Sequence, residues 1–260
     1  MPVTDYAKDL ELLIDAAREA GRIAMPFSNA DPEIWDKPDG AGPVTEADLA
    51  VNRMLEAELQ KARPDYGWLS EETPPNDQRL ERDRVFIVDP IDGTRSFIEG
   101  SKTWAHSIAI AENSKIVAGV VFLPLRDKLY AAAQDLGASL NGAALSPSKV
   151  SNMEAAEVLA ARPTMDDKYW TTPPLFNRSH RPSLAYRLSL VAEGRFDAML
   201  TLRPTWEWDI AAGTVILEEA GVAVSDKTGS TLKFNNADPR LPGVVAANAP
   251  LHAAITSALA

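Results

Sequence analysis

The sequence predicts a layered α+β fold in which helices and strands mix without strict alternation. Helical periodicity opens the chain and returns in its second half, at Leu184–Ala192 and at Ile210–Ala220. Between these helices lie short β-branched segments joined by Gly and Asn-Gly turns, a pattern typical of hairpins. Since the elements do not follow one another as strand–helix–strand units, a doubly wound parallel sheet is not expected.

The first part of the chain is predicted to hold two helices. Apolar residues recur at helical spacing from Tyr6 onward; Thr4 or Asp5 is placed to cap this helix, and Pro26 should end it. The segment NADPEIWDKPDGAGP is rich in Pro, Gly and Asp and predicts a loop. A second helix is predicted from about Thr45 to Ala62, and the polar segment ETPPNDQRLERDR that follows predicts an exposed connection.

Strand-like segments dominate the middle of the chain and return towards its end. They read, in order, VFIVD, SIAIAE, IVAGVVFLP, KLYAAAQDLGASLNGAAL (as hairpins), AEVLAAR, FDAMLTL, GVAVSD and GVVAAN. A weaker helical pattern occupies the C-terminus. A boundary near Val150–Glu157 is expected to separate residues 1–150 from residues 151–260, within one compact unit.

The composition restricts the kinds of metal site and partner that are expected, and the cellular compartment. The 260 residues, 45% of them hydrophobic, suffice for a buried core, and they include no cysteine and only three scattered histidines. A cysteine-ligated metal site is therefore impossible and a histidine-rich one is not expected, so any metal should be a hard cation bound by oxygen. The net charge of −11 argues against a nucleic-acid polymer or an anionic membrane as partner. Because the N-terminus does not resemble a signal peptide and no apolar run is long enough for a membrane span, a cytoplasmic protein is expected.

Two aspartates three positions apart mark the stretch VDPIDGTRSFIEG, Val88–Gly100. Asp89 ends an apolar, strand-like run, the proline after it lacks a backbone donor, and Gly93 permits a sharp turn. A simple Asp-Gly turn needs only Asp92. Two carboxylates held close together repel, so one is protonated or a cation lies between them. A hard divalent cation is the favoured interpretation, because no basic residue precedes Arg95 in this stretch.

Three further places put acids beside turn or helix signals. Thr45 and Asp48 have the spacing of a helix capping box. Glu71 and Glu72, in GWLSEET, are adjacent glutamates, which usually form a solvated face or charge the start of a helix. Asp209, in WEWDIAAGTVILEEAG, stands where an N-cap aspartate would, and a helix N-terminus also favours a nearby phosphate. Together these acids suggest a site for two or three metal ions, which suits in-line phosphoryl transfer.

The motifs WLSEET, DPIDGTRSF and WEWDIAAG occur in this order, and the chain contains neither a P-loop nor a dinucleotide-binding fingerprint nor a G-x-S-x-G elbow. This combination resembles the inositol monophosphatase family of magnesium-dependent, lithium-sensitive phosphatases. The similarity covers nearly the whole chain, including LYAAAQDLGASLNG and LVAEGRFDAML. The resemblance implies a layered α/β/α/β sandwich, often dimeric, and a phosphoric monoester hydrolase. It also implies two to three Mg²⁺ ions, with Mn²⁺ as a substitute.

The resemblance implies a role for each candidate residue. The implied metal ligands are Glu71, Asp89, the carbonyl of Ile91, Asp92 and Asp209. The implied catalytic residues are Asp48 and Thr94, which orient and deprotonate the attacking water, with Thr45 packed beside them and Glu72 acting from behind the ligands. The implied substrate contacts are the backbone N–H groups of Gly93 and Thr94, together with Ser183, Arg187 and Asp209. For Asp48, capping therefore becomes a secondary role.

The substrate stays open among several small phosphorylated metabolites. Inositol monophosphatases, 3'(2'),5'-bisphosphate nucleotidases, histidinol-phosphate phosphatases and some fructose-1,6-bisphosphatases share these motifs. Nucleotidases often carry Lys at the position of Arg187, and a fixed guanidinium suits a second phosphate. The segments TWEWD and KFNNADPRLPG also resemble bacterial bisphosphate nucleotidases. Against this, both the nucleotidases and the inositol monophosphatases usually have Gly-Ser just before this helix, where the present chain has Arg181-Pro182-Ser183. Arg187 also fits an ordinary surface arginine of a helix equally well.

The favoured hypothesis is therefore a 3'(2'),5'-bisphosphate nucleotidase that converts adenosine 3',5'-bisphosphate to AMP. An inositol-1-phosphate phosphatase, or a histidinol-phosphate phosphatase, is the alternative among enzymes. A metal-binding regulatory protein is the alternative outside enzymes, because some members of the family also act in RNA metabolism.

Overall fold

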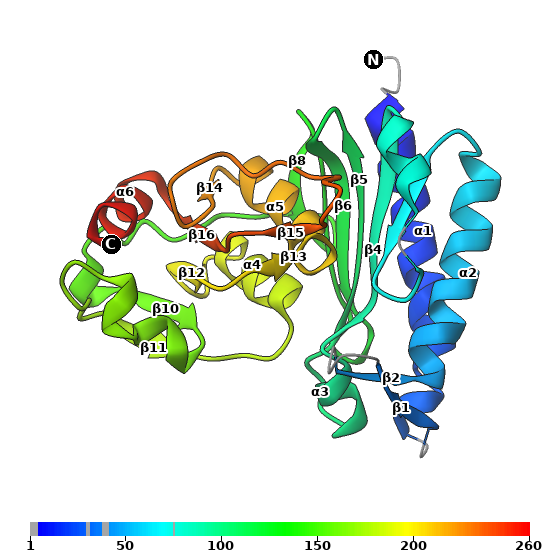
Figure 1. Cartoon of the computed structure of the whole chain (residues 1–260), viewed down its shortest axis with the longest axis horizontal. Helices are drawn as coiled ribbons and strands as arrows, with labels where there is room; N and C mark the ends of the chain where they lie inside the picture. The colour runs from blue at the N-terminus through cyan, green and yellow to red at the C-terminus, as the bar shows by residue number, and fades with distance from the viewer. Residues whose placement is uncertain (1–4, 30–31, 38–41, 75) are drawn as a thin grey trace.

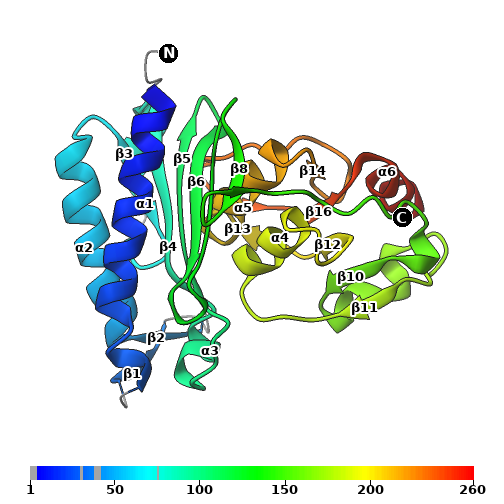
Figure 2. The ribbon, with the colours of Figure 1, turned by 180° about the vertical axis from the view of Figure 1, so that it is seen from behind.

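The computed structural model describes residues 5–29, 32–37, 42–74 and 76–260. The predicted cap at Thr4 lies outside them. The two larger β-sheets of the described residues stand roughly side by side, with one pair of helices between them and further helices on the outer faces (Figures 1 and 2). Two smaller sheets have two strands each, and one of these pairs β13 (Thr205–Trp206) with β15 (Arg240–Leu241). None of the described helices combines the length and the hydropathy of a membrane-spanning segment.

The first sheet has seven strands and follows the chain in order. The strands are β3 (Gly67–Ser70), β4 (Arg84–Asp92), β5 (Ala105–Glu112), β6 (Lys115–Leu123), β7 (Lys128–Ala133), β8 (Gly137–Leu140) and β9 (Ala143–Ala144). Only β3 and β4 pair parallel, and the remaining neighbours pair antiparallel, as the hairpin pattern predicted.

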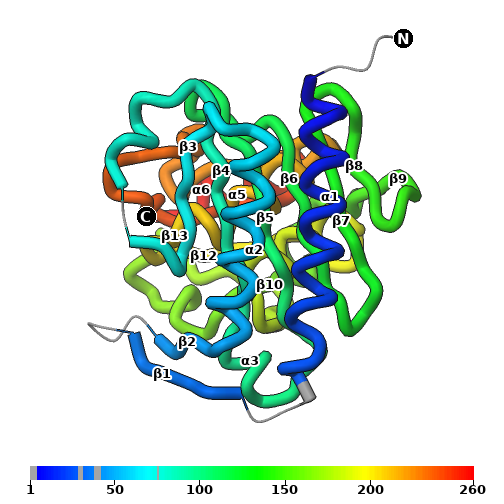
Figure 3. The backbone as a smooth tube through the Cα atoms, turned by 90° about the vertical axis from the view of Figure 1, so that its right-hand side faces the viewer, coloured from blue at the N-terminus to red at the C-terminus, as the bar shows by residue number. Residues whose placement is uncertain are grey.

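Helices α1 (Asp5–Ala24) and α2 (Glu46–Ala62) cover the outer face of this sheet (Figure 3). The apolar alternation of β4 explains why both faces of the sheet are covered. Phe86 and Val88 point into the core beneath α1 and α2, whereas Val85 and Ile87 point into the core on the other face. A strand that is apolar on both faces needs a helical layer on each side.

The second sheet has five strands in a mixed order. It runs β11 (Asn177–Ser179), β10 (Glu157–Ala160), β12 (Ala198–Thr201), β16 (Val244–Ala247) and β14 (Ala223–Ser225). Helices α4 (Leu184–Ala192) and α5 (Glu207–Glu219) fill the space between the two sheets, and α6 (Ala249–Ala258) packs on the outer face of the second. The layered α/β/α/β sandwich is therefore confirmed, with α6 as an added outer cover.

Two segments predicted as a loop and as an exposed connection differ from the prediction, and the short elements that were not predicted include β3, α3 (Thr94–Ile98) and β11. The predicted loop after α1 contains a short hairpin of β1 (Ile34–Asp36) and β2 (Pro43–Thr45), although residues 30–31 and 38–41 of it lie outside the described part. The polar connection before β4 is not wholly exposed, because Arg79 is buried and donates a 2.7 Å hydrogen bond to the carbonyl of Asn236. Both features depend on partners distant in sequence, so local composition did not predict them.

Candidate active site

A bulge in β4 brings Asp89 and Asp92 to the same side of the first sheet. Their partners on β5 are only two positions apart, so two residues of β4 lie opposite one residue, His106. In a regular strand, residues three positions apart point to opposite faces, and the extra residue of a bulge reverses this relation. The sequence prediction that the strand ends at Asp89 is therefore wrong: β4 continues to Asp92 and the turn begins at Gly93, whose φ of 99° favours glycine.

His106 anchors the bulge from the neighbouring strand. Its Nδ1 lies 2.5 Å from the carbonyl oxygen of Pro90. Because a carbonyl oxygen only accepts, Nδ1 carries the proton. The ring is fully buried beside Trp104 and Phe122, and burial lowers the pKa of His106 to about 4, so it stays neutral near pH 7. No sequence pattern indicates this role, since a lone histidine in an apolar strand is usually a core residue.

Replacing His106 by Phe should loosen the bulge without emptying the core. The Pro90 carbonyl loses its buried donor, so the free energy of unfolding should fall by about 1–3 kcal/mol. The Mg²⁺ concentration needed for half-maximal activity should rise, because Asp89 and Asp92 lose their fixed spacing. Urea denaturation and a metal titration measure the two effects. Phe122→Leu is the control, since it removes a ring that contacts His106 but keeps the hydrogen bond. An unchanged metal requirement in His106→Phe would contradict the positioning role.

Three aspartates converge at the end of β4. One carboxylate oxygen from each of Asp89, Asp92 and Asp209 lies within 4.8 Å of the others. Asp209 comes from the first turn of α5, and the hydroxyl of Ser107 donates a 2.9 Å hydrogen bond to the carbonyl of Trp208 just before it. The prediction of Asp209 as an N-cap is wrong, because α5 begins at Glu207 and Asp209 faces the other acids instead.

The electrostatics of this cluster fit a hard cation. Burial, reinforced by the neighbouring acids, raises the pKa of Asp89 and of Asp209 well above the usual range. Oδ1 of Asp89 is buried and has no hydrogen-bond partner within the described residues. An orphaned carboxylate oxygen among further carboxylates is an oxygen-only donor set, which suits Mg²⁺ or Mn²⁺.

Asp92 also forms hydrogen bonds with residues at the start of α4. Its Oδ2 accepts hydrogen bonds from the Ser183 hydroxyl at 2.6 Å and from the Ala185 N–H at 2.7 Å. Burial raises the pKa of Asp92 to about 6, although these two hydrogen bonds oppose the rise. Ser183 adopts a φ of 65°, uncommon for a residue other than glycine, so the backbone is strained where α4 meets the site.

Thr45 and Asp48 form the predicted capping box and also reach the candidate site. The Thr45 N–H donates to Oδ2 of Asp48 at 2.8 Å, and the Asp48 N–H donates to the Thr45 hydroxyl at 3.3 Å. The second oxygen of Asp48, Oδ1, lies 3.2 Å from the hydroxyl of Thr94, which is also 3.2 Å from the carbonyl of Ile91. Burial raises the pKa of Asp48 to about 6, against the lowering effect of Thr45. Capping therefore uses one oxygen of Asp48 and leaves the other facing Thr94.

Glu71 lies beside Asp89 because β3 and β4 pair parallel, and its N–H donates to the carbonyl of Val88 at 3.1 Å. Lys37, which follows β1, places its Nζ 2.6 Å from a carboxylate oxygen of Glu71 and 2.6 Å from one of Glu72. Burial and Glu71 raise the pKa of Glu72 to about 7, and Lys37 opposes this rise. The sequence did not indicate Lys37, because it falls in a segment predicted as loop.

The acids line a cleft of about 510 Å³, which Arg95, His180, Arg187 and Arg203 also line. Arg187 is not an ordinary surface arginine: it is half-buried, donates to the carbonyl of Arg181, and lies 2.8 Å from Nε2 of His180. Burial and Arg203 lower the pKa of Arg187, whereas Asp92 and Asp209 oppose that shift. His180 and Arg203 also line the cleft and were not predicted, since no motif marks them.

Comparisons with known proteins agree with this geometry. Residues 5–260 match the model of the inositol monophosphatase family. The chain is 32% identical to the 3'(2'),5'-bisphosphate nucleotidase CysQ of Salmonella typhimurium, over 86% of this chain and 93% of that protein. It is 31% identical to an inositol-1-monophosphatase of Mesorhizobium japonicum, over 96% and 95% of the two chains. The crystal structure of the extragenic suppressor protein suhB from Bartonella henselae matches with a TM-score of 0.82 and 27% identity, covering 96% of this chain and 97% of that one. The chain therefore belongs to the inositol monophosphatase family of phosphatases.

Proposed function

We propose that this protein is a Mg²⁺-dependent phosphomonoesterase whose substrate carries a second phosphate, as in the conversion of adenosine 3',5'-bisphosphate to AMP. The supporting observation is the position of Arg187, which lines the same cleft as the acid cluster, together with His180 and Arg203. The acid cluster alone does not distinguish one phosphomonoester from another. A second phosphate gives the guanidinium groups a partner through charge-assisted, often bidentate, hydrogen bonds. The 32% identity to CysQ of Salmonella typhimurium agrees with this choice.

The acids fit the role of metal ligands. We assign two to three Mg²⁺ ions, replaceable by Mn²⁺, to the acids and one carbonyl of the cleft, namely Glu71, Asp89, the Ile91 carbonyl, Asp92 and Asp209. Bound metal would polarise the phosphate and offset the charge that develops on the leaving oxygen. Glu72 and Lys37 act behind the ligands, where the lysine fixes the orientation of Glu71.

Thr94 and Asp48 are placed to act on the attacking water. The Thr94 hydroxyl donates to Asp48 and can accept a hydrogen bond from water, which passes its proton through Thr94 to Asp48. A pKa of about 6 leaves Asp48 ionised near neutral pH and still basic enough to accept this proton. The water oxygen forms its bond to phosphorus as the ester P–O bond breaks in line, giving inorganic phosphate and an alcohol whose oxygen takes up a proton. We assign the backbone N–H groups of Gly93 and Thr94 to the phosphate oxygens.

An inositol-1-phosphate phosphatase is the second candidate, favoured by the 31% identity to the Mesorhizobium japonicum enzyme over nearly the whole chain. With that substrate, Arg187 would face an uncharged ring and contribute little to binding.

Arg187→Ala separates the two candidates. The kcat/KM for adenosine 3',5'-bisphosphate should fall about tenfold to a hundredfold, because a charge-assisted hydrogen bond is lost. The kcat/KM for inositol 1-phosphate should change much less. Both are measured by phosphate release, with Arg53→Ala, on an exposed site of α2, as the control. Equal losses on both substrates would remove the argument for a second phosphate. No turnover of any phosphomonoester, with metal bound normally, would favour a metal-binding regulatory protein.

A further inference from the structure

A second hollow adjoins the cleft at Arg187 and Arg203. It has a volume of about 260 Å³ and shares His180, Leu184, Arg187 and Arg203 with the cleft. Beyond these residues its wall is largely apolar and includes Pro163, Tyr169, Leu200 and Leu202. An aromatic ring and aliphatic side chains next to two arginines suit a nucleobase attached to a phosphate, because bases stack on aromatic and guanidinium planes.

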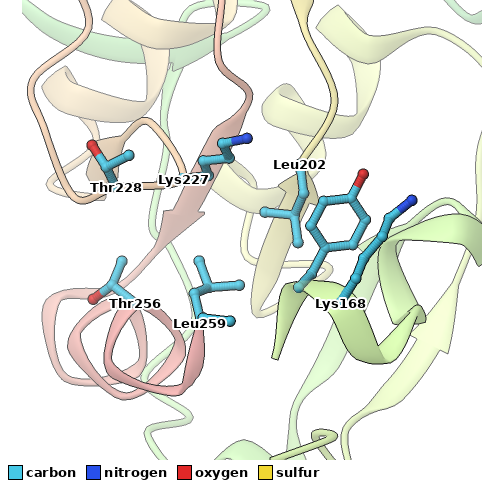
Figure 4. A pocket seen from close by; sticks show the side chains of 8 residues that line it. Lys168, Leu202, Lys227, Thr228, Thr256 and Leu259 are labelled. Carbon is cyan, nitrogen blue, oxygen red and sulfur yellow. The ribbon is translucent and has the colours of Figure 1, made fainter. Parts of the chain in front are cut away.

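A third hollow, of about 460 Å³, adjoins the second, since Tyr169 and Leu202 line both. It lies between α6, the Lys168–Tyr169 turn and the Lys227–Thr228 turn after β14. Figure 4 shows Lys227 reaching towards Leu202, with Lys168 on the other side of Leu202 and Leu259, which follows α6, below Lys227. The three hollows therefore form a series that leads from the acid cluster to a pair of lysines.

The lysines leave positive charge at this end of an acidic protein. Lys168 has a weak ion pair with Asp166, at 3.7 Å, and its Nζ lies 4.9 Å from the centroid of the Tyr169 ring. No ion pair of Lys227 occurs among the described residues. The nearest acid on the same turn, Asp226, is already satisfied by the N–H and hydroxyl of Thr228, at 2.7 and 2.6 Å. With a net charge of −11 over the whole chain, two lysines facing one hollow favour a bound anion.

We propose that the substrate extends through all three hollows and is a phosphomonoester of dinucleotide length with an anionic far end. This inference rests on the proposed function and adds the length and the distal charge of the substrate. The scissile phosphate lies at the acid cluster, an internal phosphate at Arg187 and Arg203, a base beside Tyr169 and Leu202, and the terminal phosphate at Lys168 and Lys227. A mononucleotide with its phosphates at the acid cluster and at Arg187 reaches no further than the second hollow, and it leaves Lys227 without an ion pair among the described residues.

Three substrates with the same scissile 3'-phosphate test the proposal. They are adenosine 3',5'-bisphosphate, the diadenosine dinucleotide 3'-phosphate with a 5'-phosphate, and the same dinucleotide without it. The 5'-phosphorylated dinucleotide should have a kcat/KM about tenfold higher than its unphosphorylated counterpart, mainly through KM, since one charge-assisted contact is added. The double variant Lys168→Ala/Lys227→Ala should abolish this preference, and Lys227→Arg should retain it. Lys233→Ala, which removes an exposed lysine outside the hollow, controls for net charge.

A preference that is absent from the wild type, or that persists in the double variant, would overturn the proposal. Cleavage of adenosine 3',5'-bisphosphate without cleavage of either dinucleotide would overturn it as well, while the proposed function would stand. If adenosine 3',5'-bisphosphate is not cleaved either, the proposed function fails and the extension fails with it.

Discussion

Asp89→Asn is expected to abolish Mg²⁺-dependent turnover while leaving the chain folded. Asparagine keeps the shape of the side chain but removes the charge at the centre of the acid cluster. Loss of metal-based stabilisation worth about 4 kcal/mol lowers kcat/KM by about a thousandfold. In the metal-free protein, the same substitution should stabilise the fold. Burial and the neighbouring acids raise the pKa of Asp89 and disfavour its ionised form, so a neutral side chain should raise the free energy of unfolding.

Phosphate release and thermal unfolding in the presence of a chelator measure the two effects. Asp135→Asn is the matched control, because Asp135 is exposed and has a φ of 64°, which asparagine also tolerates. If activity survives in Asp89→Asn, the metal assignment is wrong. A lower melting temperature of the metal-free variant would show that Asp89 supports the fold through contacts rather than opposing it through charge.

Apolar periodicity predicted most of the elements, because helices and strands of this chain bury regular faces. The helix predicted at Leu184–Ala192 is observed with the same bounds, and the strand patterns from VFIVD to GVVAAN all coincide with observed strands. The motif acids were also predictable. Asp89 and Asp92 lie at the end of an apolar run, and Asp209 lies at the start of a helix, where packing alone does not call for an acid. The fold brings the three together.

The features that orient these acids depend on pairing between distant segments. The bulge is defined by which residues of β5 face β4, and His106 carries no signal of that role in its own neighbourhood. Lys37 reaches Glu71 only because a short hairpin forms in a segment rich in Pro and Gly. Arg203 follows β12, and its position in the same cleft as the acids depends on how the second sheet packs against α4. Such contacts are not encoded by any local pattern.

Mg²⁺ is expected to stabilise the protein strongly near pH 8 and hardly at all near pH 5. Without metal, the pKa values of Asp48 and Asp92 are raised to about 6 and that of Glu72 to about 7, above the ordinary values of 3.8 and 4.5. Between about pH 4 and pH 7 the folded state therefore binds more protons than the unfolded state, so stability falls as pH rises. For Asp48 alone, the shift corresponds to about 3 kcal/mol.

A divalent cation replaces the protons that the acid cluster otherwise holds, so its stabilising effect grows over the same pH range in which the metal-free protein weakens. At a Mg²⁺ concentration of about a hundred times the Kd, the gain is about 2.7 kcal/mol, or several degrees in melting temperature. Thermal unfolding across this pH range, with and without Mg²⁺, measures it. NaCl at equal ionic strength controls for screening, which also relieves repulsion between acids. Asp89→Asn should lose most of the Mg²⁺-dependent gain. An equal gain from NaCl, or a gain that does not change with pH, would mean that the cluster is not a specific metal site.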